Sequence, residues 1–196
     1  MPLFERFKSK QSAIDFLQRT YFGEAYVGAT LARLEADAQT IKLMMDWMKK
    51  PFYEKKFLVY LGTPGIGKTY MAAAMIEWIV ENFNTFRYYK IQDLHSILRQ
   101  SFDGMGDYHK VLELAIDDEL IIIDDIGSDK ISEWKEEILF DIIDERYNSM
   151  KPTIITSNML RKDWENNYQD RIISRLFDKS NTIIEINDKS KDKRRN

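Results

Sequence analysis

Residues 62–69, which read GTPGIGKT, constrain the fold more than any other part of the chain. An apolar run at residues 57–60 precedes them and a helical pattern at residues 71–76 follows, so we expect a strand, a loop and a helix in that order. Glycines at these spacings let the backbone curl until successive N–H groups point at phosphate oxygens, with Lys68 reaching the β- and γ-phosphates and Thr69 offering a hydroxyl to Mg²⁺. The alternative, a glycine-rich turn that binds nothing, is disfavoured because the complete pattern stands at a strand-to-helix junction.

The composition excludes several other classes of site. The chain has 196 residues, of which 44% are hydrophobic, and this is enough for one domain with a buried core. It contains no cysteine, which excludes disulfides and thiolate zinc sites, and its two histidines have no matching ligand set. No signal peptide or membrane-spanning run is visible, so we expect a cytoplasmic protein without a membrane partner. The net charge of −3 is not that of a globally basic protein, so DNA contact would need a local patch or an assembled pore.

Apolar, β-branched runs alternate with helical patterns along the rest of the chain. The expected strands are residues 57–60, 86–91, 120–123, 152–156 and 182–186. We expect Asp93 to cap a helix that glycines at 104–106 interrupt, and Ser132 to cap a later helix with acidic residues in its first turns. Strands that alternate with helices predict an α/β fold with a five-stranded parallel sheet covered on both faces.

The N-terminal residues form a separate segment in this interpretation. Residues 1–22 carry scattered aromatic side chains and are expected to be a short helical or irregular lead. From residue 24 to residue 50, apolar side chains recur at spacings of three and four, which predicts a single helix with a narrow apolar seam. The seam either packs on the core or docks on a partner protein. We therefore divide the chain into an N-terminal helical segment open to partner binding (1–50), a nucleotide-binding domain (51–187) and a disordered charged tail (188–196).

Two further groups of polar side chains follow strands, where open α/β sheets bind their ligands. Asp124 and Asp125 end the third strand; the first can hold Mg²⁺ and the second can orient or deprotonate an attacking water. Their alternative is a solvated acidic turn before Gly127. Asn158 follows the next strand and can place a neutral amide beside the γ-phosphate, although a tripeptide such as Thr-Ser-Asn is by itself an ordinary polar turn.

Arg171 and Arg175 are four residues apart and therefore share one helical face. Arginine stabilises charge on a transferring phosphoryl group, and a neighbouring subunit can supply it. The alternative is surface salt bridging to Asp170 or Asp178, which an isolated arginine pair would favour.

Taken in this order, the motifs resemble the initiator clade of AAA+ ATPases, and specifically the DnaC/DnaI-type helicase loaders and their relative, the IstB transposition ATPase. The resemblance covers about residues 52–187. Residues 62–69 resemble Walker A, 122–127 Walker B, 156–158 sensor 1, and 170–176 the arginine-finger motif. It implies a three-layer AAA+ P-loop domain that binds ATP or ADP with Mg²⁺.

The resemblance also implies a role for each matched residue. Lys68 and Thr69 would bind phosphate and Mg²⁺, Asp124 would help to hold the metal, and Asp125 would activate water. Asn158 would act as sensor 1, and Arg175 would act in trans with support from Arg171. The implied nucleotide contacts are Gly62, Thr63, Pro64, Gly65, Ile66, Gly67, Lys68, Thr69 and Tyr70.

The implied partners are a replicative hexameric helicase, single-stranded DNA and further copies of the chain in an oligomer or spiral. The helices expected between residues 93 and 115 fall where this clade inserts a helix used for single-stranded DNA, although their cations are sparse. Three departures qualify the match: Asp125 stands where many AAA+ proteins have glutamate, no C-terminal helical lid is expected, and residues 1–50 are too short for a zinc-bearing helicase-binding domain. We therefore expect slow, assembly-dependent hydrolysis, in a phage or plasmid version of a bacterial loader.

Three other functions stay open at this point. An IstB-like transposition helper would share the fold and the site. A nucleotide-dependent interaction switch would use the same site with little hydrolysis. A small-molecule nucleotide kinase would share residues 62–69, here called the phosphate loop, but would need an arginine-rich substrate lid.

Overall fold

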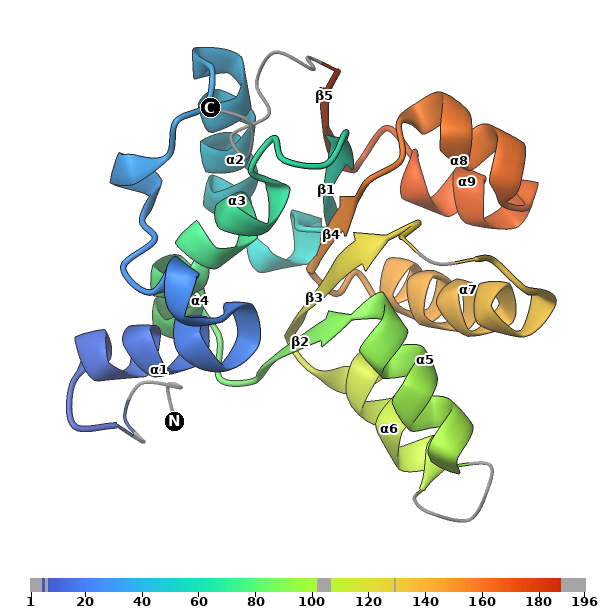
Figure 1. Cartoon of the computed structure of the whole chain (residues 1–196), viewed down its shortest axis with the longest axis horizontal. Coiled ribbons are helices and arrows are strands. Elements are labelled where there is room, and N and C mark those ends of the chain that lie inside the picture. Colours follow the sequence, from blue (N-terminus) through green and yellow to red (C-terminus); the bar gives the residue numbers. More distant parts are fainter. Residues whose placement is uncertain (1–4, 6, 102–106, 129, 188–196) are drawn as a thin grey trace.

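Five parallel strands form the centre of the computed structural model, which describes residues 5, 7–101, 107–128 and 130–187. They hydrogen-bond in the order β2-β3-β4-β1-β5 (Figure 1). The strands are β1 Phe57–Gly62, β2 Phe86–Lys90, β3 Leu120–Ile126, β4 Thr153–Ser157 and β5 Thr182–Ile186. The predicted α/β fold with a five-stranded parallel sheet is confirmed.

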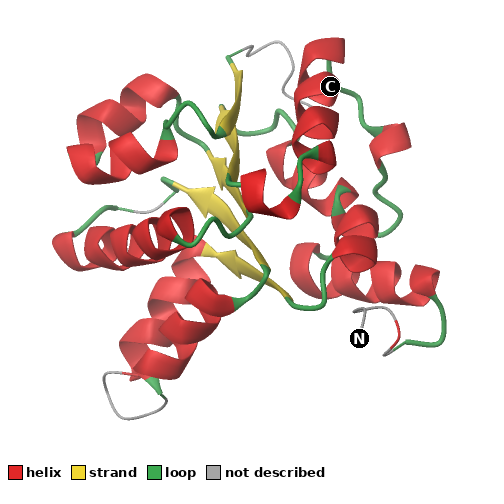
Figure 2. Ribbon diagram, turned by 180° about the vertical axis from the view of Figure 1, so that it is seen from behind, coloured by secondary structure: helices red, strands yellow, loops and turns green. Residues whose placement is uncertain are grey.

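Helices cover both faces of this sheet (Figures 1 and 2). The first face carries α1 Lys10–Phe22, η2 Glu24–Tyr26, η3 Leu31–Arg33, α2 Ala38–Lys49, α3 Lys68–Ala74 and α4 Ile76–Asn82. The second face carries α5 Ile91–Gln100, α6 Tyr108–Asp117, α7 Glu133–Asn148, α8 Arg161–Asn167 and α9 Asp170–Leu176. A short turn, η4 Phe52–Glu54, leads into β1. None of the helices in the described residues is long and apolar enough to span a bilayer.

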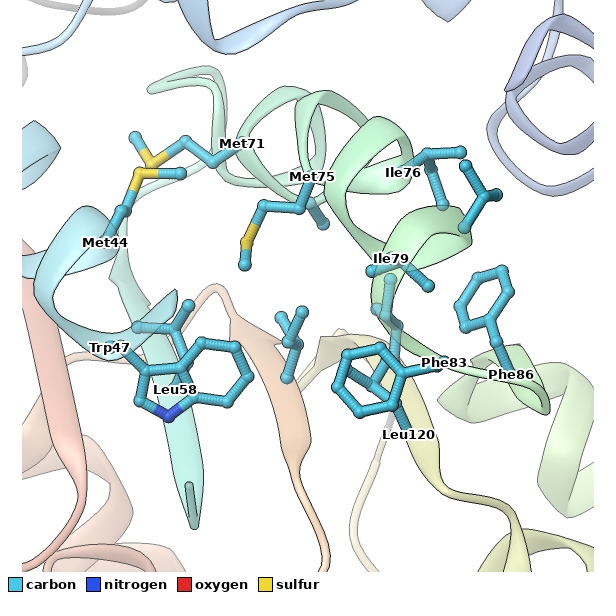
Figure 3. Close-up of a cluster of buried hydrophobic side chains, with 14 of the residues drawn as sticks. Met44, Trp47, Leu58, Met71, Met75, Ile76, Ile79, Phe83, Phe86 and Leu120 are labelled. Carbon is cyan, nitrogen blue, oxygen red and sulfur yellow. The ribbon is translucent and has the colours of Figure 1, made fainter. Parts of the chain in front are cut away.

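The two hydrophobic clusters follow from the alternation of side chains along each strand. Leu58 and Tyr60 of β1 point into the first cluster, whereas Val59 and Leu61 point into the second. Both faces are buried, so the strands read as continuous apolar runs rather than alternating ones. Figure 3 shows part of the first cluster, to which α2 contributes Met44 and Trp47 and β1 contributes Leu58.

The prediction of one helix over residues 24–50 is wrong. Two short 3₁₀ turns come first, and α2 begins only at Ala38. Gly28 has a φ of 83°, a left-handed conformation that interrupts any helix, and the Asp37 carboxylate accepts a hydrogen bond from the Thr40 N–H at 2.9 Å, which caps a new helix.

The predicted apolar seam is not the buried face of α2. Its side chains are exposed or only partly buried: Leu31, Leu34, Ala38, Ile41, Met45 and Met48. The apolar side chains that α2 buries are Met44 and Trp47, in the first cluster together with Ile14 and Leu17 of α1. Met45 lies on the outer side of α2 and is 36% exposed. Both helices of the N-terminal segment therefore pack on the sheet, and the domain division at residue 50 stays a prediction.

Several boundaries differ from the expectations. The helical pattern after the phosphate loop divides at Met75 into α3 and α4, and the Ala73 carbonyl beside this division accepts a hydrogen bond from the buried Gln18 Nε2 of α1 at 3.1 Å. Ile91 starts α5 rather than ending β2, so Asp93 lies in the first turn of α5 instead of capping it.

Other boundaries fall close to their predicted places. Ser132 caps α7 as expected, because its side chain accepts a hydrogen bond from the Lys135 N–H. Strand β3 is three residues longer than predicted and includes both acidic residues. The predicted break at 104–106 and the predicted tail at 188–196 lie outside the described residues.

Candidate functional site

A cavity of about 530 Å³ opens at the carboxyl ends of the strands, between the phosphate loop and β3. Most of the predicted site residues line it: Pro64, Gly65, Gly67, Lys68, Thr69, Tyr70, Asp124, Asp125 and Asn158. Four lining residues were missed by the sequence interpretation: Phe22, Tyr26, Tyr88 and Lys90. The predicted contacts Gly62, Thr63 and Ile66 belong to the loop but are not among the residues that line the cavity.

Two glycines set the shape of the phosphate loop. Gly67 adopts a left-handed conformation with a φ of 92° immediately before α3, which a residue with a Cβ adopts only with strain. At Gly62 a Cβ would lie 2.3 Å from the Ile186 carbonyl oxygen of β5, so only glycine allows the loop and β5 to approach this closely. The start of the loop therefore packs directly against the end of β5.

Lys68 is the central cation of the site. It is only 6% exposed, and its Nζ donates hydrogen bonds to the carbonyl oxygens of Gly62 at 2.7 Å and Thr63 at 3.0 Å. The same Nζ lies 2.8 Å from Oδ1 of Asn158, at the end of β4. The lysine thus connects the phosphate loop to the residue predicted to sense the γ-phosphate.

Asp124 is a buried carboxylate surrounded by hydroxyl groups. The Thr156 Oγ1 donates to its Oδ1 at 2.5 Å and the Tyr88 hydroxyl to its Oδ2 at 2.9 Å, while the Thr69 Oγ1 lies 3.3 Å from Oδ1. Burial, with the nearby Asp124 charge, raises the pKa of Tyr88 well above its usual value, so its phenol keeps its proton and acts as a donor. Three hydroxyl partners compensate the burial of this charge.

Asp125 lies at an irregularity of β3. Its φ is 65°, and the pairing of β3 with β4 shifts register between Ile123 and Ile126. Its backbone N–H donates to the Thr156 Oγ1 at 2.9 Å, and its carboxylate accepts a hydrogen bond from the Asn158 side-chain amide. Such bulges redirect side chains beside active sites, and here the second acid joins Asn158 at the cavity.

The arrangement fits a magnesium nucleotide. Mg²⁺ takes one or two oxygen ligands from a protein and keeps phosphate oxygens and waters for the rest. The Thr69 hydroxyl and the Asp124 carboxylate, which lie side by side at the cavity, supply such a pair. The buried ammonium of Lys68 supplies a positive charge for phosphate oxygens on the loop side.

The two predicted arginines lie elsewhere. Neither lines the cavity, as far as the described residues show. The Arg175 Nε makes an ion pair at 2.7 Å with the Asp144 carboxylate of α7, and the Arg171 guanidinium lies over the Phe140 ring at 4.1 Å. The salt-bridging alternative thus finds a partner in Asp144 rather than in the two carboxylates expected from sequence, and the role in trans stays a prediction.

The missed residues depend on strand register and on the packing of the N-terminal segment. In the parallel pair of β2 and β3, Lys90 stands opposite Asp124 and Tyr88 opposite Ile122, so both β2 side chains share the face of the acidic residue. The sequence indicated that alternate side chains of the predicted strand 86–91 share one face. It did not indicate the register of this strand with β3, which places Tyr88 and Lys90 near Asp124. Phe22 and Tyr26 reach the cavity because α1 packs on α3 and α4.

Comparison with known proteins gives related sequences over most of the chain. A family model described as IstB-like ATP binding protein matches residues 33–196. The chain is 31% identical over 121 residues to an insertion sequence IS5376 putative ATP-binding protein of Geobacillus stearothermophilus, covering 61% of this chain and 47% of that protein. It is 24% identical over 119 residues to the replicative helicase loader DnaC of Escherichia coli strain K12, covering 60% and 49%. The chain spans about half the length of these curated relatives.

Solved structures show the same fold. A crystal structure of the DnaC helicase loader matches with a TM-score of 0.70 and 24% identity over 83% of this chain and 99% of that chain. A crystal structure of DnaI matches with a TM-score of 0.69 and 20% identity, over 83% and 92%. The predicted AAA+ P-loop architecture and the predicted resemblance are confirmed. Because the family model covers most of its residues, this chain belongs to the family of IstB-like ATP-binding proteins.

Proposed function

We propose that this chain is a Mg²⁺-dependent AAA+ ATPase that helps to load a replicative hexameric helicase onto single-stranded DNA. The observation that carries the ATPase part is the meeting of Lys68, Asp124, Asp125 and Asn158 around one cavity, with hydrogen bonds linking the lysine to the amide and the amide to the second acid. The loader part is supported by the likeness to DnaC in sequence and fold.

Each side chain has a distinct task in this proposal. A bound Mg²⁺ would neutralise charge on the β- and γ-phosphate oxygens, with Thr69 and Asp124 as its protein ligands. Lys68 binds the same phosphates from the loop side. Asp125 orients a water for in-line attack and accepts its proton, and Asn158 links that carboxylate to Lys68. Asp125 has a short side chain held by an amide, which supports slow turnover.

A transposition helper is the second candidate, because the matching family model and the relative from an insertion sequence point to it. It would use the same ATP site with different partners. An interaction switch that binds nucleotide with little hydrolysis would also keep the site, and it differs only in turnover.

The loader proposal predicts capture of purified replicative helicase by the immobilised full chain in the presence of Mg·ATP. We expect the docking surface within residues 1–50, where Phe16 of α1 and Met45 of α2 are exposed, at 51% and 36%. Phe16→Asp and Met45→Asp should therefore weaken capture, because a charge in a docking surface loses apolar contact and must be desolvated. The matched control is Met150→Asp, an equally apolar side chain, 45% exposed, that follows α7.

The loader role would be contradicted if the unmodified chain binds ATP but does not capture the helicase. That result would favour the transposition helper, which should instead bind double-stranded DNA together with a transposase. Equal weakening by all three substitutions, or unchanged capture by Phe16→Asp and Met45→Asp, would contradict a docking surface at these two side chains.

The proposed role of Arg175 in trans gives a further prediction. Arg175→Ala should bind ATP with unchanged affinity but lose roughly 10²-fold or more in turnover, because arginines supplied in this way stabilise charge that develops only in the transition state. Mixing Arg175→Ala with Lys68→Ala, each inactive alone, should restore part of the ATPase rate, since an intact loop then meets an intact arginine. Arg161→Ala, which removes an exposed arginine of α8, is the control. Mixtures that stay inactive would exclude action in trans.

A further inference from the structure

The Asp124 carboxylate is held from both neighbouring strands of the sheet. On one side, the Tyr88 hydroxyl of β2 lies 2.9 Å from Oδ2, and on the other, the Thr156 hydroxyl of β4 lies 2.5 Å from Oδ1. Motifs in the sequence identify the acid but not the tyrosine. We propose that Tyr88 is a positioning residue that fixes Asp124 for metal binding, and that aromatic side chains of the N-terminal segment hold it there.

The direction of these hydrogen bonds follows from the donors and acceptors present. The Thr156 Oγ1 accepts the Asp125 N–H at 2.9 Å, so its own proton is directed to Asp124. The Tyr88 phenol donates its single proton to the other carboxylate oxygen. A carboxylate offers about four lone-pair positions, and these two donors leave one on each oxygen.

The remaining lone pairs are available toward Thr69. Its Oγ1 lies 3.3 Å from Oδ1 and 3.5 Å from Oδ2 of Asp124, nearly equidistant from both oxygens. A metal ion that takes the Thr69 hydroxyl as a ligand would therefore meet a carboxylate whose plane is already set. Partners that orient a metal ligand in this way typically change metal affinity or activity by about 10- to 100-fold when removed.

Aromatic rings from the N-terminal segment surround Tyr88. The Phe22 ring lies 4.6 Å from the Tyr88 ring and the Tyr21 ring 5.6 Å, measured between centroids. Phe22 is the last residue of α1, and Tyr26, in η2, lies 6.1 Å from it. Both Phe22 and Tyr26 also line the cavity. These residues precede region 33–196, which the family model matches, so the family model itself does not predict their place at the site.

The inference rests on the proposed function, and the test measures metal binding rather than turnover. A fluorescent ATP analogue is titrated with Mg²⁺ at fixed concentrations of protein and analogue. Tyr88→Phe should raise the Mg²⁺ concentration at half-maximal binding about 10-fold, and should leave the affinity measured in EDTA unchanged. The matched control is Tyr89→Phe, which removes the same hydroxyl one residue along β2, on the face of the second cluster, and should leave the midpoint unchanged.

A second variant tests the aromatic support. Phe22→Leu keeps an apolar side chain but removes the ring that packs on Tyr88, so it should raise the Mg²⁺ midpoint in the same direction by a smaller factor. Thermal unfolding of each variant separates positioning from simple packing. A lower melting temperature of Tyr88→Phe with an unshifted Mg²⁺ midpoint would overturn the inference.

The failures of the two proposals are distinguishable. If the unmodified chain shows no Mg²⁺-dependent binding of the analogue, the proposed function fails and the inference fails with it. If the unmodified chain shows that dependence and Tyr88→Phe has the same midpoint, the inference alone is overturned.

Discussion

Lys68→Ala should weaken ATP binding by roughly 30-fold or more and reduce hydrolysis to background. The ammonium is buried at the phosphate loop, where a charge-assisted hydrogen bond contributes about 2 kcal/mol, and about 1.4 kcal/mol corresponds to tenfold in affinity. The loss in turnover should exceed the loss in binding, because removing one donor to developing charge typically costs about 10²- to 10³-fold in kcat. Calorimetry with a non-hydrolysable ATP analogue and a phosphate-release assay measure the two effects separately.

The Lys68 variant also loses contacts within the protein, so its fold must be checked. The Lys68 Nζ donates hydrogen bonds to the Gly62 and Thr63 carbonyls and to Asn158, and the variant loses all of these hydrogen bonds. Lys162→Ala removes an exposed lysine of α8 and should change neither binding nor turnover. ATPase activity of Lys68→Ala equal to that of the Lys162→Ala control, with both variants folded, would contradict the entire assignment of the site.

The phosphate loop and the two acids could be predicted because their placement depends on local sequence. A strand, a glycine-rich turn and a helix follow one another within residues 57–74, and parallel strands bring their carboxyl ends to one edge. Thus Asp124, Asp125 and Asn158 meet the loop although they are far from it in sequence. The positive φ of Asp125 could not be predicted from sequence. It occurs where the Asp125 N–H donates a hydrogen bond to Thr156 of the neighbouring strand, and this contact depends on how the two strands pair.

The N-terminal segment shows where periodicity alone fails. Apolar spacings of three and four between residues 24 and 50 fit one helix. However, Gly28 interrupts the helical conformation within that range and Asp37 caps a new helix. Of the side chains with that spacing, Leu31, Leu34 and Met48 pack against the first cluster, and the side chains that α2 buries there are Met44 and Trp47. Phe22 and Tyr88 could not be assigned to the cavity from sequence for a related reason, since their place there depends on how separate elements pack.

Arg146→Met should lower the free energy of unfolding by about 4 kcal/mol or more, and the melting temperature by about 10 °C. The guanidinium is fully buried at the far end of α7, and its Nη1 donates to the carbonyl oxygens of Ile116 at 2.7 Å and Asp118 at 2.9 Å. Its Nη2 donates to the Pro152 carbonyl at 2.7 Å and its Nε to the Thr153 hydroxyl at 2.8 Å.

These bonds tie the end of α6 to the start of β4. Methionine would remove the guanidinium donors from all of them, although the Ile116 carbonyl keeps the Lys151 Nζ at 3.1 Å. The stability is lowered by each buried acceptor that is left without a donor. Each such group costs about 1–3 kcal/mol, against a total stability of about 5–15 kcal/mol for a domain. Burial lowers the pKa of Arg146, because removal from water disfavours the charged form. Arg146→Lys, with fewer donors in a different geometry, should recover only part of the loss.

The control for this prediction is Arg161→Met on α8, whose ion pair with Glu165 is exposed and should contribute less than about 1 kcal/mol. Chemical denaturation monitored by tryptophan fluorescence gives both free energies, since Trp47 and Trp78 lie at the first cluster and Trp134 and Trp164 at the second. Losses of similar size at Arg146 and Arg161 would contradict the anchoring role of Arg146. A large loss at Arg146 in one fluorescence transition would show that α6, α7 and β4 unfold with the whole sheet, including the strand ends that carry the proposed ATP site.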